Sequence, residues 1–315
     1  MRYSRFPAAT KAAGLALSIL LAGSACGAGA AQASTQGAAV TGPVSREERV
    51  RQELRKLEAS YEGRIGAYAV DTATGRTVGN RSGERFPLLS TFKALAAGAV
   101  LHKARTSDPG LMDRVIRWKA EEVVEYSPVT EKHVRDGMTV AALCEAAITR
   151  SDNTAGNMLL RQIGGPAGLT GYLRTLKDPV SRLDRWETDL NVWKPGAKRD
   201  TTTPVAAARD LRALTAGDAL HAKDRARLNG WLRANQTGDA RIRAGLPRTW
   251  IIGDKTGSTS YYGGANDIAV IWPGKSAAPI IMSIYTDRRA ADAPYDEAVI
   301  AQTATILARG LGRLP

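Results

Sequence analysis

Hydrophobic positions at the start of the chain change from a helical to a strand spacing. Apolar residues of the segment 45–61 recur on one helical stripe behind Ser45, a residue type that often begins helices. An amphipathic helix is therefore predicted over 45–61. Two strands joined by turn residues are predicted next, at 64–70 and 76–80.

Helical periodicity dominates the middle of the chain. The segment 86–101 is apolar nearly all round, which indicates a helix buried inside a domain. Further helices are predicted at 139–148, 154–163, 166–176 and 218–235, and one begins at Thr203-Pro204. The periodicity disappears between 181 and 200, and such a long polar loop in a compact domain is more often functional than idle.

Strands return near the C-terminus, followed by a last helix. They are predicted at 250–258, 266–272 and 280–286, with the helix at 290–309. Strands at both ends predict an α/β (α+β) fold, in which one antiparallel sheet is assembled from both termini and flanked by helices. We expect an α/β lobe from 44–85 and 245–315, an all-helical lobe from 86–244 that includes an Ω-loop at 181–200, and an active site in the cleft between them.

The N-terminus has the pattern of an export signal. Residues 1–33 combine a basic start, an apolar run and the cleavage site Ala31-Gln32-Ala33, and the apolar run is too short for a stable membrane span. Residues 34–43 are expected to form a flexible leader. We expect a secreted protein, extracellular or periplasmic. Lipid attachment at Cys26 is a less favoured alternative, because Gly23 stands where lipoprotein signals carry a large aliphatic residue.

Composition narrows the class of partner. The net charge of +13 is compatible with nucleic-acid binding, but the arginines are scattered between acidic residues and no basic cluster alternates with aromatics. We therefore expect a basic, solvated surface, no nucleic-acid partner and a monomer. The three histidines show no ligand spacing, so neither a metal nor another cofactor is expected. Cys144 lies in an apolar helix and is expected to be a small core residue.

Ser90-Thr91-Phe92-Lys93 is the first candidate for chemistry. Positions i and i+3 share a helix face, and an amine held in apolar surroundings beside a hydroxyl can activate it as a nucleophile. The alternative is a lysine whose stem runs along the core to water, with Ser90 as an ordinary helix-start residue. The tetrapeptide alone leaves the two interpretations evenly balanced.

Further motifs decide between these interpretations. Ser151-Asp152-Asn153 lies in a short turn between helices, Lys255-Thr256-Gly257 lies on a strand after the helical lobe, and Glu187 and Asn191 lie in the long loop. Ser151-Asp152-Asn153 alone is a common helix-capping turn, and Lys255-Thr256-Gly257 alone is a weaker signal still. Their order and separation match a signature shared by class A β-lactamases and penicillin-binding proteins.

From about residue 45 to the end, the sequence resembles the class A serine β-lactamases. Residues 125–129 (EYSPV) resemble the family's substrate-cleft segment, and 185–191 (RWETDLN) match its loop signature. Arg185 and Asp200 stand where the family has the salt bridge that closes this loop. NDIAVIWP, at 266–273, is also family-like.

The resemblance implies hydrolysis of the β-lactam amide bond of penicillins and cephalosporins through a serine acyl-enzyme, and hence antibiotic resistance. Backbone N–H groups of Ser90 and Ser258 would bind the oxyanion. Lys93 and Glu187 compete as the base for acylation, and Glu187 is the expected base for deacylation through a water. The implied catalytic residues are Ser90, Lys93, Ser151 and Glu187, and the implied substrate-binding residues are Tyr126, Asn153, Asn191, Arg241, Lys255, Thr256, Gly257 and Ser258.

Two of these assignments have plain alternatives, and some positions depart from the family. Arg241 is otherwise a surface arginine, and Tyr126 an ordinary packed tyrosine. Thr259 replaces a common glycine, and also the cysteine that carbapenem-hydrolysing members pair with the residue before the nucleophile, here Leu89. The substrate spectrum is therefore open. Cys144 matches a family position that is sometimes disulfide-bonded. The partner position of the family falls near Ala97 in this sequence, so no disulfide is expected.

Two rival functions share the same fold. A penicillin-binding D,D-peptidase uses the same three motifs but lacks a water-activating glutamate, so Glu187 in its loop signature discriminates against it. A non-catalytic cell-wall-binding homologue would have lost part of the catalytic set, yet every expected side chain is present.

Overall fold

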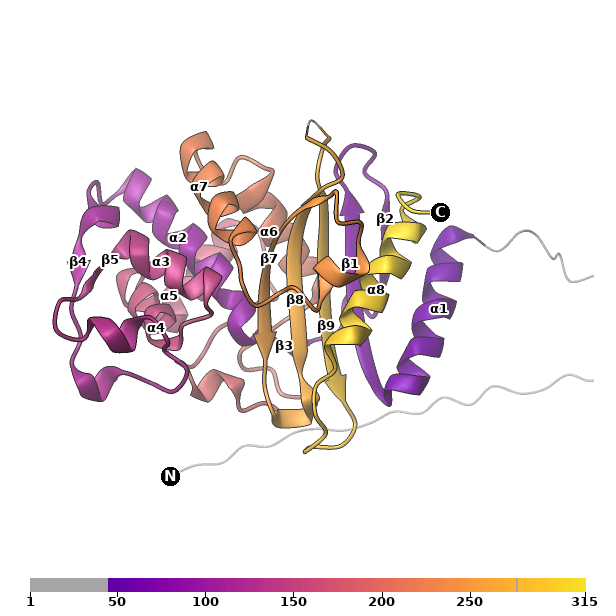
Figure 1. The fold of residues 1–315 in the computed structure, drawn as a ribbon, viewed down its shortest axis with the longest axis horizontal. Coiled ribbons are helices and arrows are strands. Elements are labelled where there is room, and N and C mark those ends of the chain that lie inside the picture. The colour runs from indigo at the N-terminus through magenta and orange to yellow at the C-terminus, as the bar shows by residue number, and fades with distance from the viewer. Residues whose placement is uncertain (1–44, 276) are drawn as a thin grey trace, which may run out of the picture. The chain divides into compact units, whose positions relative to one another are not determined.

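A five-stranded antiparallel sheet forms the centre of the fold (Figure 1). Its strands are β1 (Gly63–Asp71), β2 (Thr77–Asn80), β7 (Ile251–Ser258), β8 (Ala265–Trp272) and β9 (Ile280–Arg288). In this computed structural model, which describes residues 45–275 and 277–315, they lie in the order β2-β1-β9-β8-β7. β1 pairs with β9 from Gly63↔Arg288 to Asp71↔Ile280, which confirms a sheet assembled from both ends of the chain.

Both faces of the sheet are covered, and this explains the nearly continuous apolar sequence of β8 and β9, which are buried along almost their whole length. Alternate residues of β8 belong to different cores. Ile268 and Val270 face the core that contains the helical segment. Ala269 and Ile271 face a second core with α1 (Arg46–Tyr61) and α8 (Glu297–Gly310).

The inserted helical segment is built around one buried helix. Its helices are α2 (Phe92–Thr106), α3 (Val140–Thr149), α4 (Asn153–Gln162), α5 (Gly165–Thr175), α6 (Pro204–Thr215) and α7 (Ala222–Arg233). Every residue of α2 from Phe92 to Leu101 is buried, and α2 packs against all five other helices of the segment. This is the environment that its all-round apolar sequence predicts. α6 also packs on β1, β8 and β9, so the insertion covers one face of the sheet (Figure 1).

The helix starts follow their predicted capping residues. Ser45 accepts a hydrogen bond from the Glu48 N–H ahead of α1, and Asp152 accepts one from the Ala155 N–H ahead of α4. Thr203 caps α6, whose first residue is Pro204. Because Asp152 is the middle residue of the Ser-Asp-Asn turn, its capping role fixes where that turn ends and α4 begins.

Short strand pairs hold the loops of the helical segment. β3 (Phe86–Pro87) pairs with β6 (Thr201–Thr202), and β4 (Val115–Ile116) pairs with β5 (Met138–Thr139). The first pair brings both ends of the 181–200 loop close to the start of α2. Arg185 Nε lies 2.6 Å from Asp200 Oδ2, so the predicted salt bridge across this loop is present.

Three predicted boundaries were wrong. The last helix begins at Glu297 rather than 290, because Pro294 precedes the Asp296 cap and the Ala291 carbonyl accepts the Tyr262 N–H. α7 begins at Ala222 rather than 218, after His221. The segment 86–101 opens with a two-residue strand at Phe86–Pro87 before it turns helical.

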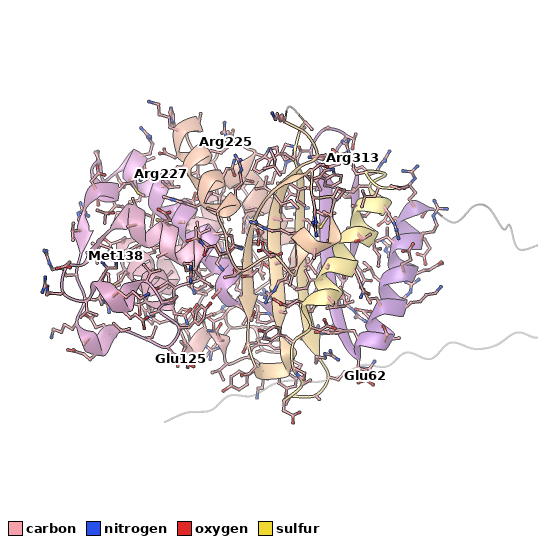
Figure 2. The ribbon with its side chains drawn as sticks, viewed as in Figure 1. Glu62, Glu125, Met138, Arg225, Arg227 and Arg313 are labelled. Atoms are coloured by element: carbon pink, nitrogen blue, oxygen red, sulfur yellow. The ribbon has the colours of Figure 1, made fainter. Side chains whose placement is uncertain are left out.

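Basic side chains come from separate elements, as Figure 2 shows for Arg225 and Arg227 on α7 and for Arg313 after α8. Each has its own local contact. Arg225 donates to the Gly217 carbonyl, Arg227 lies over the ring of Trp231, and Arg313 pairs with Asp71.

None of the helices within the described ranges is long and apolar enough to cross a membrane. The predicted signal peptide 1–33, the leader 34–43 and Cys26 lie outside those ranges.

Candidate active site

Ser90 and Lys93 meet where a turn of 3₁₀-helix leads into α2. The turn covers Leu89–Thr91, and α2 begins at the next residue. Lys93 Nζ donates to Ser90 Oγ at 2.8 Å and is completely buried. The predicted pair is therefore real, and the alternative in which the lysine extends to water is wrong.

Four oxygens surround the Lys93 ammonium group. Besides Ser90 Oγ, it contacts the Ser151 carbonyl at 2.8 Å, Asn153 Oδ1 at 2.6 Å and Glu187 Oε1 at 2.9 Å. Burial lowers the pKa of Lys93, and the Glu187 carboxylate opposes that shift. The neighbours thus compensate in part for the loss of water, and a proton on Lys93 is easier to release than on an exposed lysine.

Glu187 is held from the loop side. Its Oε1 accepts a hydrogen bond from Ser90 Oγ at 3.2 Å, and its Oε2 accepts one from Asn191 Nδ2 at 2.6 Å. Asn157 on α4 fixes the Glu187 backbone by two hydrogen bonds of 2.9 Å, one to its carbonyl and one from its N–H. Asn157 was not identified from the sequence. Its position one turn after the Ser-Asp-Asn motif was the only available signal.

Ser151 faces a second buried lysine. Lys255 Nζ donates to Ser151 Oγ at 3.0 Å and to the Thr256 carbonyl at 2.7 Å. Burial lowers the pKa of Lys255 well below its ordinary value, and the charge of Lys93 lowers it further. The Ser151 hydroxyl therefore has a strong donor at its oxygen, which leaves its own proton available for transfer.

Asn153 connects the two sides of the cleft. Its Oδ1 accepts from Lys93, and its Nδ2 donates to the Glu125 carbonyl at 2.8 Å. A second Nδ2 hydrogen remains for another acceptor. The side chain can therefore hold Lys93 and contact a bound molecule at the same time.

Strand β7 passes very close to Ser90, and Gly257 permits this approach. A Cβ atom built on Gly257 would lie 2.8 Å from Leu89 Cβ and 3.0 Å from the Ser90 nitrogen. Neither neighbour can move easily, because both belong to the buried 3₁₀ turn that leads into α2. The glycine thus brings the end of β7, including Ser258, beside the nucleophile.

Arg241 is buried beneath the end of β7, so its interpretation as a surface arginine was wrong. It is 3% exposed and donates to Ser258 Oγ at 2.6 Å and to the Gly257 carbonyl at 2.9 Å. Its Nε donates to Glu297 at 2.9 Å. The result is a cation placed directly behind the Ser258 hydroxyl.

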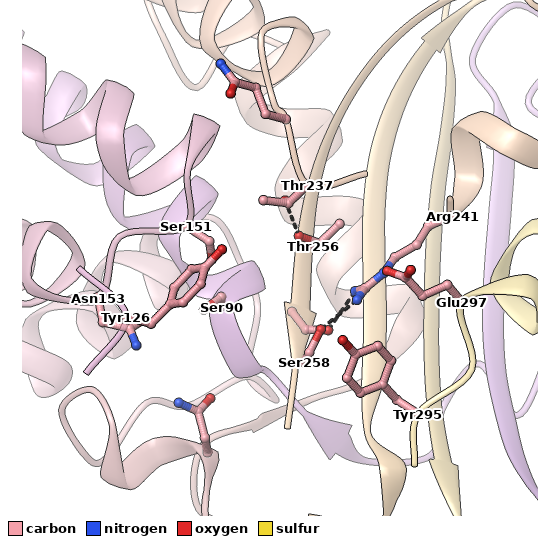
Figure 3. A pocket seen from close by; sticks show the side chains of 13 residues that line it. Ser90, Tyr126, Ser151, Asn153, Thr237, Arg241, Thr256, Ser258, Tyr295 and Glu297 are labelled. Atoms are coloured by element: carbon pink, nitrogen blue, oxygen red, sulfur yellow. Dashed lines mark hydrogen bonds and ion pairs between the residues drawn. The ribbon is translucent and has the colours of Figure 1, made fainter. Parts of the chain in front are cut away.

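Many of the predicted residues line one cavity of about 500 Å³, shown in Figure 3: Ser90, Tyr126, Ser151, Asn153, Asn191, Arg241, Thr256, Gly257 and Ser258. Lys93, Glu187 and Lys255 are buried and reach this lining through their contacts with Ser90, Asn191 and Ser151. Tyr126 is 59% exposed at the rim of the cavity, which fits a cleft wall better than a packed tyrosine. Residues that the sequence did not single out also line the cavity: Gln236, Thr237, Tyr295 and Glu297. Thr237 Oγ1 lies 2.5 Å from Thr256 Oγ1, so the row of hydroxyls extends beyond the predicted motif.

Neither cysteine chemistry nor metal chemistry is indicated in the described part of the chain. Within it, no group of three or more His, Cys, Asp or Glu side chains could hold a metal ion. Cys144 is buried and free, and burial raises the pKa of its thiol. This agrees with the prediction of a core residue.

Comparisons with known proteins agree on the family. The family model described as "Beta-lactamase enzyme family" matches residues 49–311. The chain is 54% identical to beta-lactamase AST-1 of Nocardia asteroides, over 82% of each chain. It is 47% identical to the carbapenem-hydrolyzing beta-lactamase KPC of Klebsiella oxytoca, over 84% of this chain and 89% of that one.

Solved structures show the same relationship. A β-lactamase structure from Streptosporangium roseum has a TM-score of 0.84 and 75% identity, over 84% of this chain and 99% of that one. A class A β-lactamase of the last common ancestor of Gram-negative bacteria has a TM-score of 0.79 and 52% identity, over 83% of this chain and 99% of that one. The chain belongs to the beta-lactamase enzyme family, and within it to class A.

Proposed function

We propose that this protein hydrolyses the β-lactam amide bond of penicillins and cephalosporins through an acyl-enzyme on Ser90, and thereby gives antibiotic resistance. The observation that carries the proposal is the position of Ser90 Oγ, 2.8 Å from Lys93 Nζ and 3.2 Å from Glu187 Oε1. A hydroxyl in contact with two groups that can take its proton is suited to nucleophilic attack.

Acylation uses both walls of the cleft. Ser90 Oγ attacks the lactam carbonyl and gives up its proton to Lys93 or Glu187, while the backbone N–H groups of Ser90 and Ser258 stabilise the oxyanion. The C–N bond then breaks, and Ser151 donates a proton to the leaving nitrogen. The contact between Lys255 Nζ and Ser151 Oγ at 3.0 Å supports this transfer, because the Lys255 N–H donates to the hydroxyl oxygen and leaves the hydroxyl proton for the leaving nitrogen.

Deacylation depends on the loop. Glu187 takes a proton from a water, and the resulting hydroxide equivalent attacks the ester carbon and releases Ser90. Asn191 supports this role because it holds the Glu187 carboxylate at 2.6 Å from its Nδ2. A penicillin-binding D,D-peptidase has no such glutamate, and the Glu187–Asn191 pair is the reason to prefer a hydrolase that turns over rapidly.

Substrate recognition rests on polar groups along β7 and its neighbours. Penicillins and cephalosporins carry a carboxylate, and Thr256 and Ser258 offer hydroxyls to it with the Arg241 cation behind Ser258. Lys255 lies on the same strand, and a bound carboxylate would favour its protonated form. Tyr126 forms a wall, and Asn153 has one free amide hydrogen for the side-chain amide of the substrate.

Two measurements test the mechanism. Glu187→Ala mixed with a penicillin should accumulate an acyl-enzyme that intact-mass spectrometry detects, whereas Glu125→Ala, which removes an exposed carboxylate beside the cleft, should not. Rapid turnover by Glu187→Ala would refute the deacylation role. Steady hydrolysis of a chromogenic cephalosporin should disappear in Ser90→Ala, and no hydrolysis by the unsubstituted protein would favour an inactive cell-wall-binding homologue.

The substrate spectrum is a separate question. One relative is named a carbapenem-hydrolyzing enzyme, but Leu89 and Thr259 occupy the two positions where such members carry paired cysteines. Initial rates with a penicillin, a cephalosporin and a carbapenem would test whether the hydrogen bond from Thr259 Oγ1 to the Asn191 carbonyl, 2.9 Å long, serves in place of that link.

We propose further that the protein is exported by its 1–33 signal, with lipid attachment at Cys26 as the alternative, and that it acts as a monomer. The division into an α/β lobe at 44–85 with 245–315 and a helical lobe at 86–244 is part of the same proposal. N-terminal sequencing of the exported protein would test the cleavage site after Ala33 directly.

A further inference from the structure

A second cavity, of about 600 Å³, lies between the 181–200 loop and the turn after β7. It shares no lining residue with the active-site cavity. Its lining comes from the 181–200 loop, from Tyr261 and Tyr262 after β7, and from Ala291.

Aromatic and apolar side chains form the body of this cavity. Trp193 is buried, at 3% exposure, and meets Tyr262 edge-on with ring centroids 6.0 Å apart. Val192 and Tyr261 are 47% and 43% exposed, so apolar surface faces solvent here. Flat aromatic side chains around an open apolar surface suit a flat apolar ligand.

The charges at this cavity are all positive. Lys194, Lys198 and Arg199 are exposed, and none of the three forms an ion pair within the described ranges. No carboxylate is among the lining residues. Arg185 is already paired with Asp200, so its charge is partly compensated. Arg199 also acts on the Asp184 carboxylate, whose pKa it helps to lower, so Lys194 and Lys198 are the least compensated cations here. Such cations beside an apolar surface are complementary to an anion with an apolar body.

Both walls of the cavity are connected to the catalytic loop. Arg185 Nη2 donates to the Val192 carbonyl at 2.9 Å. On the other wall, Thr259 Oγ1 accepts the Tyr261 N–H at 3.2 Å and donates to the Asn191 carbonyl at 2.9 Å. Asn191 in turn holds Glu187 from the inner side of the loop. A molecule that pushes these walls apart or together therefore acts on the residue that positions Glu187.

We propose that this cavity binds a small organic anion with an aromatic body, such as an aryl carboxylate or sulfonate, and that its occupancy changes the deacylation rate through Asn191. The effect on deacylation rests on the role proposed for Glu187, whereas binding of the anion does not. Because the two sites are connected through Asn191, a ligand bound in this cavity and a non-covalent ligand in the active site should change each other's affinity by the same factor.

Binding is tested with the fluorescent probe 8-anilinonaphthalene-1-sulfonate and the full chain. We expect saturable binding at one site, which persists when the active site of Glu187→Ala is blocked by penicillin. The double variant Lys194→Glu/Lys198→Glu should weaken binding by about 10-fold, because it reverses two exposed charges at the cavity. Ala291→Trp, which fills the cavity without a charge change, should abolish it.

The matched control is Lys132→Glu/Lys223→Glu, which makes the same change in net charge at two exposed lysines elsewhere and should bind the probe normally. Equal affinity in all three variants would overturn the assignment of the site. Binding to vesicles of anionic phospholipid without binding of the free sulfonate would show that the ligand is not a small organic anion.

The coupling has its own readout. Single-turnover kinetics with a penicillin should show a deacylation rate that changes as the probe saturates, in the unsubstituted protein and not in Ala291→Trp. Saturable binding with an unchanged deacylation rate would overturn the coupling and leave the binding site in place. Failure of Glu187→Ala to accumulate acyl-enzyme would instead refute the proposed mechanism.

Discussion

Asp210 is a buried acid whose charge Arg174 compensates only in part, and replacing it by asparagine should stabilise the protein. Asp210 lies on α6 at 1% exposure, and neither of its carboxylate oxygens has a hydrogen-bond partner in the described part of the chain. Burial raises the pKa of Asp210 to about 9, and the nearby Asp178 carboxylate raises it further. Asp178 itself accepts N–H groups of Val180 and Ser181, at the start of the Ω-loop. The folded protein therefore keeps a proton on Asp210 at neutral pH.

The sign and size of the effect follow from the two pKa values. The unfolded chain releases this proton above its ordinary pKa of 3.8, and the folded chain holds it up to about 9, so this group lowers the free energy of unfolding as pH rises between those values. At pH 7, about three pH units above the ordinary pKa, the penalty is about 4 kcal/mol. At pH 5 it is about 2 kcal/mol, so the penalty grows steadily between these two pH values.

Urea unfolding of Asp210→Asn and the unsubstituted protein at each pH from 5 to 9 measures this directly. An asparagine needs no ionisation, and its Nδ2 can donate to Asp178, so the stability gain should grow with pH over this range. Asp113→Asn, at an exposed position without an ion pair in the described ranges, is the control and should show no such trend. A difference for Asp210→Asn that is constant from pH 5 to 8 would refute the reasoning, whatever its size.

Three substitutions near the cleft have separable effects. Gly257→Ala should lower kcat/KM for a chromogenic cephalosporin by about 100-fold, because its Cβ would lie 2.8 Å from Leu89 Cβ and displace β7; an unchanged value would contradict the close approach. Thr259→Val keeps the side-chain shape but removes the bond to the Asn191 carbonyl, so deacylation in stopped-flow should slow about 5-fold while acylation stays constant. Arg241→Ala should lower the free energy of unfolding in urea by about 2–4 kcal/mol, because Arg241 is buried. It should also raise KM for a penicillin but not for the methyl ester of that penicillin. Equal effects on both substrates would show that Arg241 does not recognise the carboxylate.

Most of the elements could be predicted because local patterns determine them. Ser45, Asp152 and Thr203 mark helix starts by their capping chemistry, and the apolar sequence of β8 and β9 indicates strands buried on both faces. The error at the last helix arose where a local pattern competes with tertiary contacts. The Ala291 carbonyl accepts the Tyr262 N–H from another part of the chain, which keeps this segment out of the helix.

The residues of the candidate site also fall into two groups, those that local sequence identifies and those that only the fold brings together. Residues inside a motif, such as Ser90 and Lys255, could be identified because their neighbours in sequence are also their neighbours in the site. Thr237 and Glu297 could not be identified from the sequence. Thr237 lies in the loop after α7 and Glu297 lies at the start of α8, and only the folded sheet brings these elements to β7. The positions of these two residues in the cavity depend on the pairing of distant strands, which no spacing along the sequence predicts.

The pairing of β1 with β9 also determines the order in which this enzyme can become active. Arg64 forms a hydrogen bond with Asp287, 223 positions further along the sequence. Contacts between residues so far apart in sequence form late in folding, because closing such a long loop costs conformational entropy before the contact can stabilise the chain. β8 and β7 join the sheet through β9, and β7 carries Lys255 and Ser258 into the cleft. A chain still being synthesised can thus build the helix of Ser90, but it cannot assemble the opposite wall of the cleft until its final strands have emerged.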